Sequence, residues 1–311
     1  MLTPLPSDRP TVGDTADLTE ADACGARTRR CAVLGSPIAH SLSPVLHHAA
    51  YDELGLDWSY EAVRVTEDGL AAYLDSRDAT WRGLSLTMPL KRAVVPLLDD
   101  LSERAAQAGA VNTVLFEDGR RHGHNTDVPG ASAAVRERYD GPLRSAVVIG
   151  GGATAASLLL ALADQGCARA VLAVRDPARA GETLAAVRRH PTPPSVSVVA
   201  LGGPGMREEA DGMADILAAP DLVASTIPAA AQDDRVLRLA GPARVVFEVV
   251  YDPWPTPLAD QARRTGKVLV GGLDLLVHQA ALQVQLMTGT TTAPLAAMRA
   301  AGEAALADRR R

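Results

Sequence analysis

The sequence predicts an α/β protein of two domains, and three observations lead to that prediction. The chain has 311 residues, which exceeds the size of about 250–300 residues at which single cores stop growing. Short apolar strands alternate with helices, a pattern typical of a parallel sheet covered on both faces. Gly150-Gly151-Gly152 directly follows an apolar strand, as in Rossmann-like, doubly wound domains that bind dinucleotides.

Composition excludes several classes of protein. The chain carries 31 basic and 37 acidic side chains, and this net charge of −6 argues against nucleic acid as a partner. No apolar run reaches the roughly 18 residues of a spanning helix, so no membrane partner is expected. Three scattered cysteines and seven histidines without ligand spacing predict neither a disulfide framework nor a metal site. A cytoplasmic protein fits these features.

The first elements follow from local signals. Residues 1–30 combine proline with polar residues and lack both a core segment and a signal peptide, so a disordered leader is predicted. An apolar strand is expected at 31–35. Ser43 is a favourable N-cap and Pro44 suits the first helical position, which predicts a helix over 45–54.

The rest of the first half continues this alternation. Further strands are expected at 58–63, 84–86 and 110–116. Further helices are expected at 67–76, from Pro89 through Lys91, from Ser102, and at 128–139. A turn is expected at Asp118-Gly119.

The second half begins after the turn residues Asp140-Gly141-Pro142. A wholly apolar strand at 146–149 precedes the glycine turn, and a helix of small residues is expected at 154–165. Later strands are expected at 170–174, 196–200, 222–224, 245–249 and 268–270, with a helix at 177–189 and helices from Asp274 on. We therefore expect a substrate domain at 31–130, completed by helices within 273–308, and a dinucleotide-binding domain at 131–272.

The glycine turn is the motif most typical of a dinucleotide site. Gly150, Gly151, Gly152, Ala153 and Thr154 begin a G-x-G-x-x-A pattern between a strand and a helix. Glycine permits the tight turn, and backbone N–H groups at a helix N-terminus attract a pyrophosphate. The alternative is a plain turn or a close helix–strand contact. In this context the five residues are predicted to bind the cofactor.

The end of the next strand indicates which dinucleotide binds. A carboxylate there would hold the ribose 2′-hydroxyl of NAD, whereas arginine accommodates the 2′-phosphate of NADP. Arg175 and Arg179 lie four residues apart and could clamp one phosphate. The alternative is two solvated arginines in an arginine-rich chain, and Asp176 leaves some NAD use possible. NADP is the predicted cofactor.

Polar side chains also gather near strand ends in the first half. The clusters are Ser41 with Ser43, Ser85 with Thr87 and Lys91, and Asn112 with Asp127. Hydroxyls and amides suit a small polyhydroxylated ligand, and a lysine with a carboxylate suits proton transfer beside a carbonyl. Each residue also has a structural interpretation as a cap, a turn residue or a solvated residue. Lys91 is unusual, because the chain has 29 arginines and only one other lysine, Lys267.

Six segments together resemble the shikimate dehydrogenase family, in the family's order and spacing. They are GSPIAHSLSP at 35–44, LTMPLK at 86–91, GAVNTV at 109–114, GHNTD at 123–127, YDPWPTPL at 251–258 and HQA at 278–280. The resemblance implies a two-domain enzyme that reversibly reduces 3-dehydroshikimate to shikimate with NADPH. It also implies a place in the shikimate pathway of aromatic amino acid biosynthesis.

The resemblance also implies roles for matching residues. Lys91 and Asp127 correspond to the catalytic pair. The substrate ligands correspond to Ser41, Ser43, Thr87, Asn112 and Gln279, with Ser85 where the family commonly has asparagine. Tyr251 and Gly272 are expected beside the nicotinamide, and Ser225 and Thr226 along the middle of the cofactor. Ala153 stands where a second adjacent glycine is usual, and Val174-Arg175-Asp176 replaces the common Asn-Arg-Thr.

Two alternatives remain open from the residues. One is a quinate/shikimate dehydrogenase, or a relative acting on an aminated analogue in a secondary pathway. The other is a non-catalytic sensor of the same fold, against which the presence of both Lys91 and Asp127 argues. The sequence does not indicate an oligomeric state.

Overall fold

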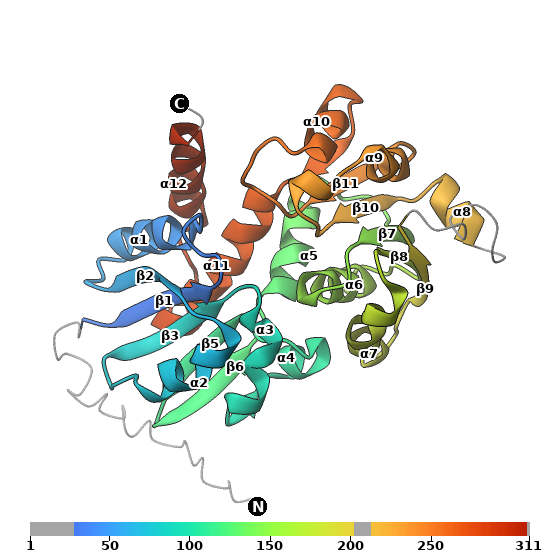
Figure 1. The fold of residues 1–311 in the computed structure, drawn as a ribbon. Coiled ribbons are helices and arrows are strands. Elements are labelled where there is room, and N and C mark those ends of the chain that lie inside the picture. The colour runs from blue at the N-terminus through green and yellow to red at the C-terminus, as the bar shows by residue number, and fades with distance from the viewer. Residues whose placement is uncertain (1–27, 202–212, 310–311) are drawn as a thin grey trace, which may run out of the picture.

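The strands of the described residues form two separate six-stranded sheets (Figure 1). The computed structural model describes residues 28–201 and 213–309. The predicted leader at 1–30 therefore lies outside the described residues except for its last three. Figure 1 shows the two sheets on either side of the molecule, with α5 (Asp127–Arg138) and α11 (Gly272–Thr288) between them.

The first sheet is mixed. Its order is β2 (Ser59–Arg64), β1 (Arg30–Gly35), β3 (Trp81–Leu86), β5 (Thr113–Glu117), β6 (Arg120–His124) and β4 (Asp100–Leu101). Strands β1, β2 and β3 are parallel, as the alternation predicts, whereas β5 runs antiparallel to β3 and β6. The predicted turn makes this hairpin possible, because Asp118 and Gly119 both adopt a positive φ. The sequence prediction missed β6 and β4.

Helices of the first half lie close to their predicted positions. They are α1 (Ser43–Glu53), α2 (Glu67–Asp75), α3 (Leu90–Ala93) with the 3₁₀ turn Val95–Leu97, and α4 (Glu103–Ala108). Ser102 caps α4 as its residue type suggests, because its side chain accepts the Ala105 N–H. Ser43 is not the predicted N-cap of α1. Leu42 already has helical dihedral angles, so Ser43 is the first helical residue and its N–H donates to Ser41 Oγ at 3.2 Å.

The second sheet is wholly parallel. Its order is β12 (Val268–Val270), β11 (Val245–Glu248), β10 (Leu222–Ser225), β7 (Ser145–Ile149), β8 (Arg169–Val174) and β9 (Ser195–Ala200). The chain runs outward from β7 through β8 to β9 and then restarts on the other side of β7 at β10. The carboxyl ends of β7 and β10 therefore flank the switch point where doubly wound sheets bind ligands.

Helices cover this second sheet. Besides α5, they are α6 (Ala153–Asp164), α7 (Gly181–Arg188), α8 (Met213–Ala218), α9 (Asp234–Ala240) and α10 (Pro257–Arg264), with 3₁₀ turns at Pro177–Ala180 and Ala229–Ala231. The predicted helix at 177–189 is thus a 3₁₀ turn followed by α7. The strands of the sheet bury residues on both faces in two apolar clusters, which explains their continuous apolar runs.

The last two helices return to the first sheet. Helix α11 packs on α5, β3 and β5, and α12 (Leu295–Asp308) packs on α1. The contact is apolar, with Leu46 and Ala50 of α1 buried against Val277, Val284 and Met298. Among the described residues, no helix is both long and apolar enough to cross a membrane.

Candidate active site

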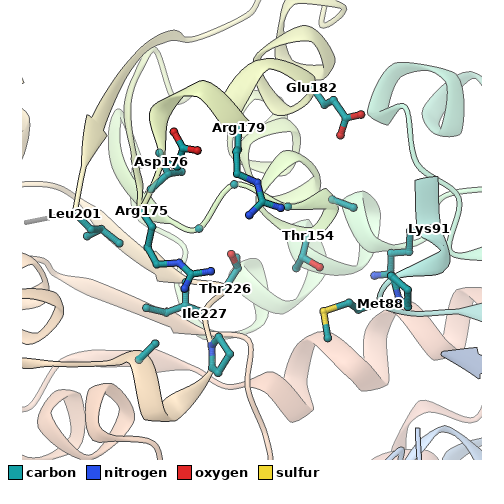
Figure 2. A pocket seen from close by; sticks show the side chains of 18 of the residues that line it. Met88, Lys91, Thr154, Arg175, Asp176, Arg179, Glu182, Leu201, Thr226 and Ile227 are labelled. Carbon is teal, nitrogen blue, oxygen red and sulfur yellow. The ribbon is translucent and has the colours of Figure 1, made fainter. Parts of the chain in front are cut away.

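A cavity of about 1140 Å³ opens between the two sheets (Figure 2). From the first sheet it is lined by the segment after β3, and from the second by the segments after β7, β8 and β10. Figure 2 shows Lys91 and Met88 at one end of the cavity and Arg175 at the other, with Thr154 between them. The cavity therefore connects the predicted catalytic lysine with the predicted cofactor residues.

Lys91 and Asp127 meet at the Lys91 end of this region. Lys91 lies on α3 and Asp127 is the first residue of α5, and their Nζ and Oδ2 atoms are 2.7 Å apart. The side chains are only 14% and 8% exposed. The N-terminus of α5 stabilises the Asp127 carboxylate through the helix dipole. Two residues that lie 36 positions apart in sequence thus form a single ammonium–carboxylate pair.

Asn112 fixes the second oxygen of that carboxylate. Its Nδ2 donates to Asp127 Oδ1 at 2.9 Å, to Thr126 Oγ1 at 2.8 Å and to Gln279 Oε1 at 3.2 Å. Its Oδ1 accepts the Thr126 N–H and the Thr113 hydroxyl. Asn112 is 1% exposed, so these bonds hold it without competition from bulk water. Asp127 is therefore oriented from both sides, by Lys91 and by Asn112.

Ser41, Ser43 and Tyr251 lie together although Tyr251 comes from the far end of the chain. The Tyr251 phenol interacts with the Leu42 backbone and the Ser41 side chain, and burial raises its pKa. Ser41 in turn accepts the Ser43 N–H. Thr87 is half-buried and lines the cavity. Of these hydroxyl-bearing residues, Thr87 lines the cavity together with Lys91, whereas Ser41, Ser43 and Tyr251 form a cluster outside its lining.

The Ser85 hydroxyl belongs to a buried hydrogen-bond network. It accepts from the Tyr60 phenol at 2.6 Å and donates to Gln283 Oε1 at 2.9 Å. Gln283 Nε2 in turn donates to the Asn112 carbonyl and the Thr113 hydroxyl. The sequence analysis missed Tyr60 and Gln283. A signal for Gln283 was present, because it lies four residues after Gln279 and so on the same face of α11.

The glycine turn has the backbone that the motif predicts. Gly150 has φ +111, and an added Cβ would lie 2.1 Å from Thr226 Oγ1, so only glycine fits. Gly152 is the N-cap of α6, and a Cβ there would meet no atom within 4 Å. Ala153 and Thr154 begin α6 and line the cavity. The turn thus offers backbone N–H groups at a helix N-terminus next to open space.

The predicted Ser225-Thr226 pair divides between core and cavity. Thr226 lines the cavity and its hydroxyl donates to the Ile149 carbonyl at 2.9 Å. Ser225 is fully buried and accepts from Gln232 Nε2 at 3.3 Å. Gly272 opens α11, and an added Cβ would lie 2.4 Å from the Val249 carbonyl oxygen, so glycine is required for close packing.

Two arginines stand at the far end of the cavity. Arg175 and Arg179 follow β8, are exposed and line the cavity, and Figure 2 shows both side chains directed into it. Among the described residues, neither arginine is paired with a carboxylate. Asp176 instead caps the 3₁₀ turn, with its Oδ1 accepting the Ala178 N–H at 3.0 Å. Two guanidinium groups and one carboxylate stand at this strand end, so its net charge is positive, which suits a 2′-phosphate.

The described residues contain no group of three or more histidine, cysteine, aspartate or glutamate side chains arranged to hold a metal ion. His47 is fully buried, stacks on Tyr60 at 3.9 Å between ring centroids, and lies 3.4 Å from Gln283 Oε1. Burial lowers its pKa from 6.5 to about 3. His47 thus belongs to the same hydrogen-bond network as Ser85, through Gln283.

Comparisons with known proteins place these features in one family. Residues 33–114 match the model of the shikimate dehydrogenase substrate binding domain, and residues 272–301 match that of the shikimate 5′-dehydrogenase C-terminal domain. The NADP(+) shikimate dehydrogenase of Moorella thermoacetica is 38% identical over 280 residues, which span 88% of this chain and 92% of that protein.

Solved structures give the same result. The shikimate dehydrogenase of Mycobacterium tuberculosis is 34% identical, with a TM-score of 0.77 over 89% of this chain and 99% of that one. The Thermus thermophilus enzyme in complex with NADP(H) and shikimate is 30% identical, with a TM-score of 0.74 over 90% of this chain and all of that chain. This similarity extends through both sheets.

Proposed function

Because the chain belongs to the shikimate dehydrogenase family, we propose that it catalyses the reversible NADPH-dependent reduction of 3-dehydroshikimate to shikimate. This reaction lies in the shikimate pathway of aromatic amino acid biosynthesis. The observation that carries the proposal is the Lys91–Asp127 pair at 2.7 Å, at one end of a cavity whose other end is the glycine turn and the arginine pair.

The residues present fit NADP. We assign the pyrophosphate to the turn Gly150–Thr154, where Gly152 borders open space at the start of α6. We assign the 2′-phosphate to Arg175 and Arg179, because both guanidinium groups line the cavity after β8 and suit a phosphate. Bound NADPH supplies the hydride that adds to the ketone carbon of the substrate.

Lys91 and Asp127 handle the proton in this proposal. Negative charge grows on the ketone oxygen as its carbon is reduced, and the Lys91 ammonium stabilises this oxygen and donates the proton that completes the hydroxyl. Asp127 holds Lys91 through Oδ2 while Asn112 holds Asp127 through Oδ1.

Side chains near this pair are proposed to bind the rest of the substrate. Ser41, Ser43 and Tyr251 converge, and we assign them to the substrate carboxylate, since hydroxyls donate well to an anion. Thr87, Asn112 and Gln279 are the proposed partners of the ring hydroxyls. Ser85 is proposed as a further substrate ligand, and Gly272 as a neighbour of the nicotinamide.

An oxidation assay tests the function directly. The purified chain is offered shikimate or quinate, each with NADP or NAD, and reduction of the cofactor is followed by absorbance. Fastest turnover with shikimate and NADP supports the proposal. Preference for quinate or an aminated analogue would assign the chain to the alternative substrate class. Tight NADPH binding without turnover in all four combinations would indicate a ligand sensor.

Two further assignments accompany this function. We propose the cytoplasm as the compartment, because Cys31 and Cys167 are buried, unpaired thiols. We also propose that residues 31–130 with the helices within 273–308 form the substrate domain and that 131–272 form the cofactor domain. The two sheets and the return of α12 to α1 support this division.

A further inference from the structure

Arg92 connects the two sides of the cavity. It follows Lys91 on the four-residue helix α3 and lines the cavity, as does Glu182 of α7 on the opposite side. One guanidinium nitrogen of Arg92 pairs with the Glu182 carboxylate, and the other donates to Thr183 Oγ1 at 3.3 Å. The planar fork of arginine suits two such bonds at once.

Thr183 continues this connection to the glycine turn. Its side chain is fully buried, and its hydroxyl donates to the Gly151 carbonyl at 2.8 Å while it accepts from Arg92. In a trans peptide the C=O and N–H point in opposite directions. Holding the Gly151 carbonyl toward Thr183 therefore turns the Gly152 N–H away from Thr183. A continuous chain of bonds thus runs from α3 to the turn assigned to the pyrophosphate.

Stability is a poor explanation for this contact. Arg92 is 27% exposed and Glu182 is 71% exposed, and ion pairs of that kind contribute between about 0 and 1 kcal/mol. Hydride transfer, by contrast, depends on the distance between two groups held by different sheets. The ketone is positioned by Lys91 on α3, whereas the nicotinamide is positioned through the glycine turn before α6.

We propose that Arg92 is a positioning residue for hydride transfer, tying the helix that carries Lys91 to the cofactor turn through Thr183. The proposal rests on the function proposed above, because it concerns the alignment of that reaction. A misplacement of about 1 Å can slow a reaction by about 10²-fold. Arg92 is partly exposed and provides only one contact, so its loss should slow the hydride-transfer step by a smaller factor, on the order of 5–30-fold.

The test is a single-turnover experiment. Enzyme saturated with NADPH is mixed with saturating 3-dehydroshikimate, and the loss of NADPH fluorescence gives a rate constant for bound enzyme. The amplitude counts active sites, so a partly unfolded preparation lowers the amplitude and leaves the rate constant unchanged. NADPH affinity is measured separately by titration.

Two variants and a matched control address the connection. Thr183→Val replaces the hydroxyl by a methyl group of similar size. Arg92→Ala and Thr183→Val should both lower the rate constant by a similar factor. Arg104→Ala is the control, because Arg104 on α4 also pairs across to the second half, with Asp164 of α6 at 3.1 Å, but does not line the cavity. Its rate constant should equal that of the wild type.

Other outcomes overturn the inference. A wild-type rate constant in Arg92→Ala would do so, and so would weaker NADPH binding with an unchanged rate constant, which would make Arg92 a ligand of the cofactor only. An equal fall of the rate constant in Arg104→Ala would show that any contact between the two halves of the chain affects hydride transfer, and not the Arg92 contact in particular. If the wild-type protein itself shows no turnover, the proposed function fails, and this result is distinct from an active wild type with an equally active Arg92→Ala.

Discussion

Replacing Lys91 by alanine tests the assignment on which the proposed chemistry depends. The Lys91 ammonium lies 2.7 Å from Asp127, and the lysine side chain is 14% exposed and lines the cavity. Removing it deletes the proposed proton donor. Asp127 keeps its bond from Asn112 Nδ2 and its place at the start of α5.

The expected loss of rate is larger than the expected loss of stability. A lost general acid lowers turnover by about 10²–10⁴-fold, which corresponds to roughly 3–5 kcal/mol of activation free energy. The carboxylate of Asp127 loses Lys91 but keeps the bond from Asn112 and adjoins a cavity that water can enter. Both features limit the loss of stability. We expect the free energy of unfolding to fall by about 1–3 kcal/mol, the cost of losing one hydrogen bond to a charged group.

The assay compares kcat, NADPH affinity and unfolding free energy in three variants. Lys91→Ala should lose turnover while it still binds NADPH. Lys91→Arg keeps the charge but hardly releases a proton. Unchanged activity in that variant would mean that residue 91 acts only by electrostatic stabilisation of the ketone oxygen. Lys267→Ala is the control: the other lysine donates to the Ala243 carbonyl at 2.6 Å and lies outside the cavity. Near wild-type turnover in Lys91→Ala would refute the proton-donor role.

The glycine turn, the arginine pair and the buried histidine each carry another prediction. Gly150→Ala places a methyl group against Thr226 on a backbone with positive φ, which strains the turn. The free energy of unfolding, measured by urea denaturation, should fall by about 1–3 kcal/mol. An unchanged free energy would contradict this strain. Arg175→Ala should raise KM for NADPH by about 10–100-fold and hardly change KM for NADH; equal effects would exclude the phosphate contact. His47 has its pKa lowered by burial to about 3, so the unfolded chain binds a proton that the native ring does not. The unfolding free energy should therefore fall as pH decreases from about 6.5, by up to roughly 1.4 kcal/mol per pH unit. In His47→Phe the unfolding free energy should depend less steeply on pH. Identical slopes in the variant and the wild type would contradict this role of His47.

Strongly apolar elements could be predicted from sequence alone. The strand predicted at 146–149 is β7, and those predicted at 170–174 and 245–249 are β8 and β11, each within one or two residues. These strands are buried on both faces, so their composition is unambiguous. By contrast, β6 has the sequence Arg-Arg-His-Gly-His and gives no apolar signal. Its pairing with β5 across the Asp118-Gly119 turn makes it a strand.

Candidate residues for the site could also be named from the sequence, whereas their contacts could not. The motifs name Lys91, Asp127 and Asn112 as candidates, and the structure brings them into hydrogen-bond contact. The Ser85 hydroxyl shows the limit, because its Tyr60 and Gln283 partners lie 25 and 198 positions away. Sequence spacing carries no information about such contacts, which depend on strand order and helix packing.

The sequence by itself determined the α/β class, the family and the residue types that can perform the chemistry. These properties reside in local patterns: apolar strands, the glycine turn, and a single lysine among conspicuously polar segments. Only the tertiary structure decided that Asp176 caps a 3₁₀ turn, and that Arg92 reaches the glycine turn through Thr183. The physical reason is that orientation and alignment depend on how two sheets approach each other, and no local pattern encodes that approach.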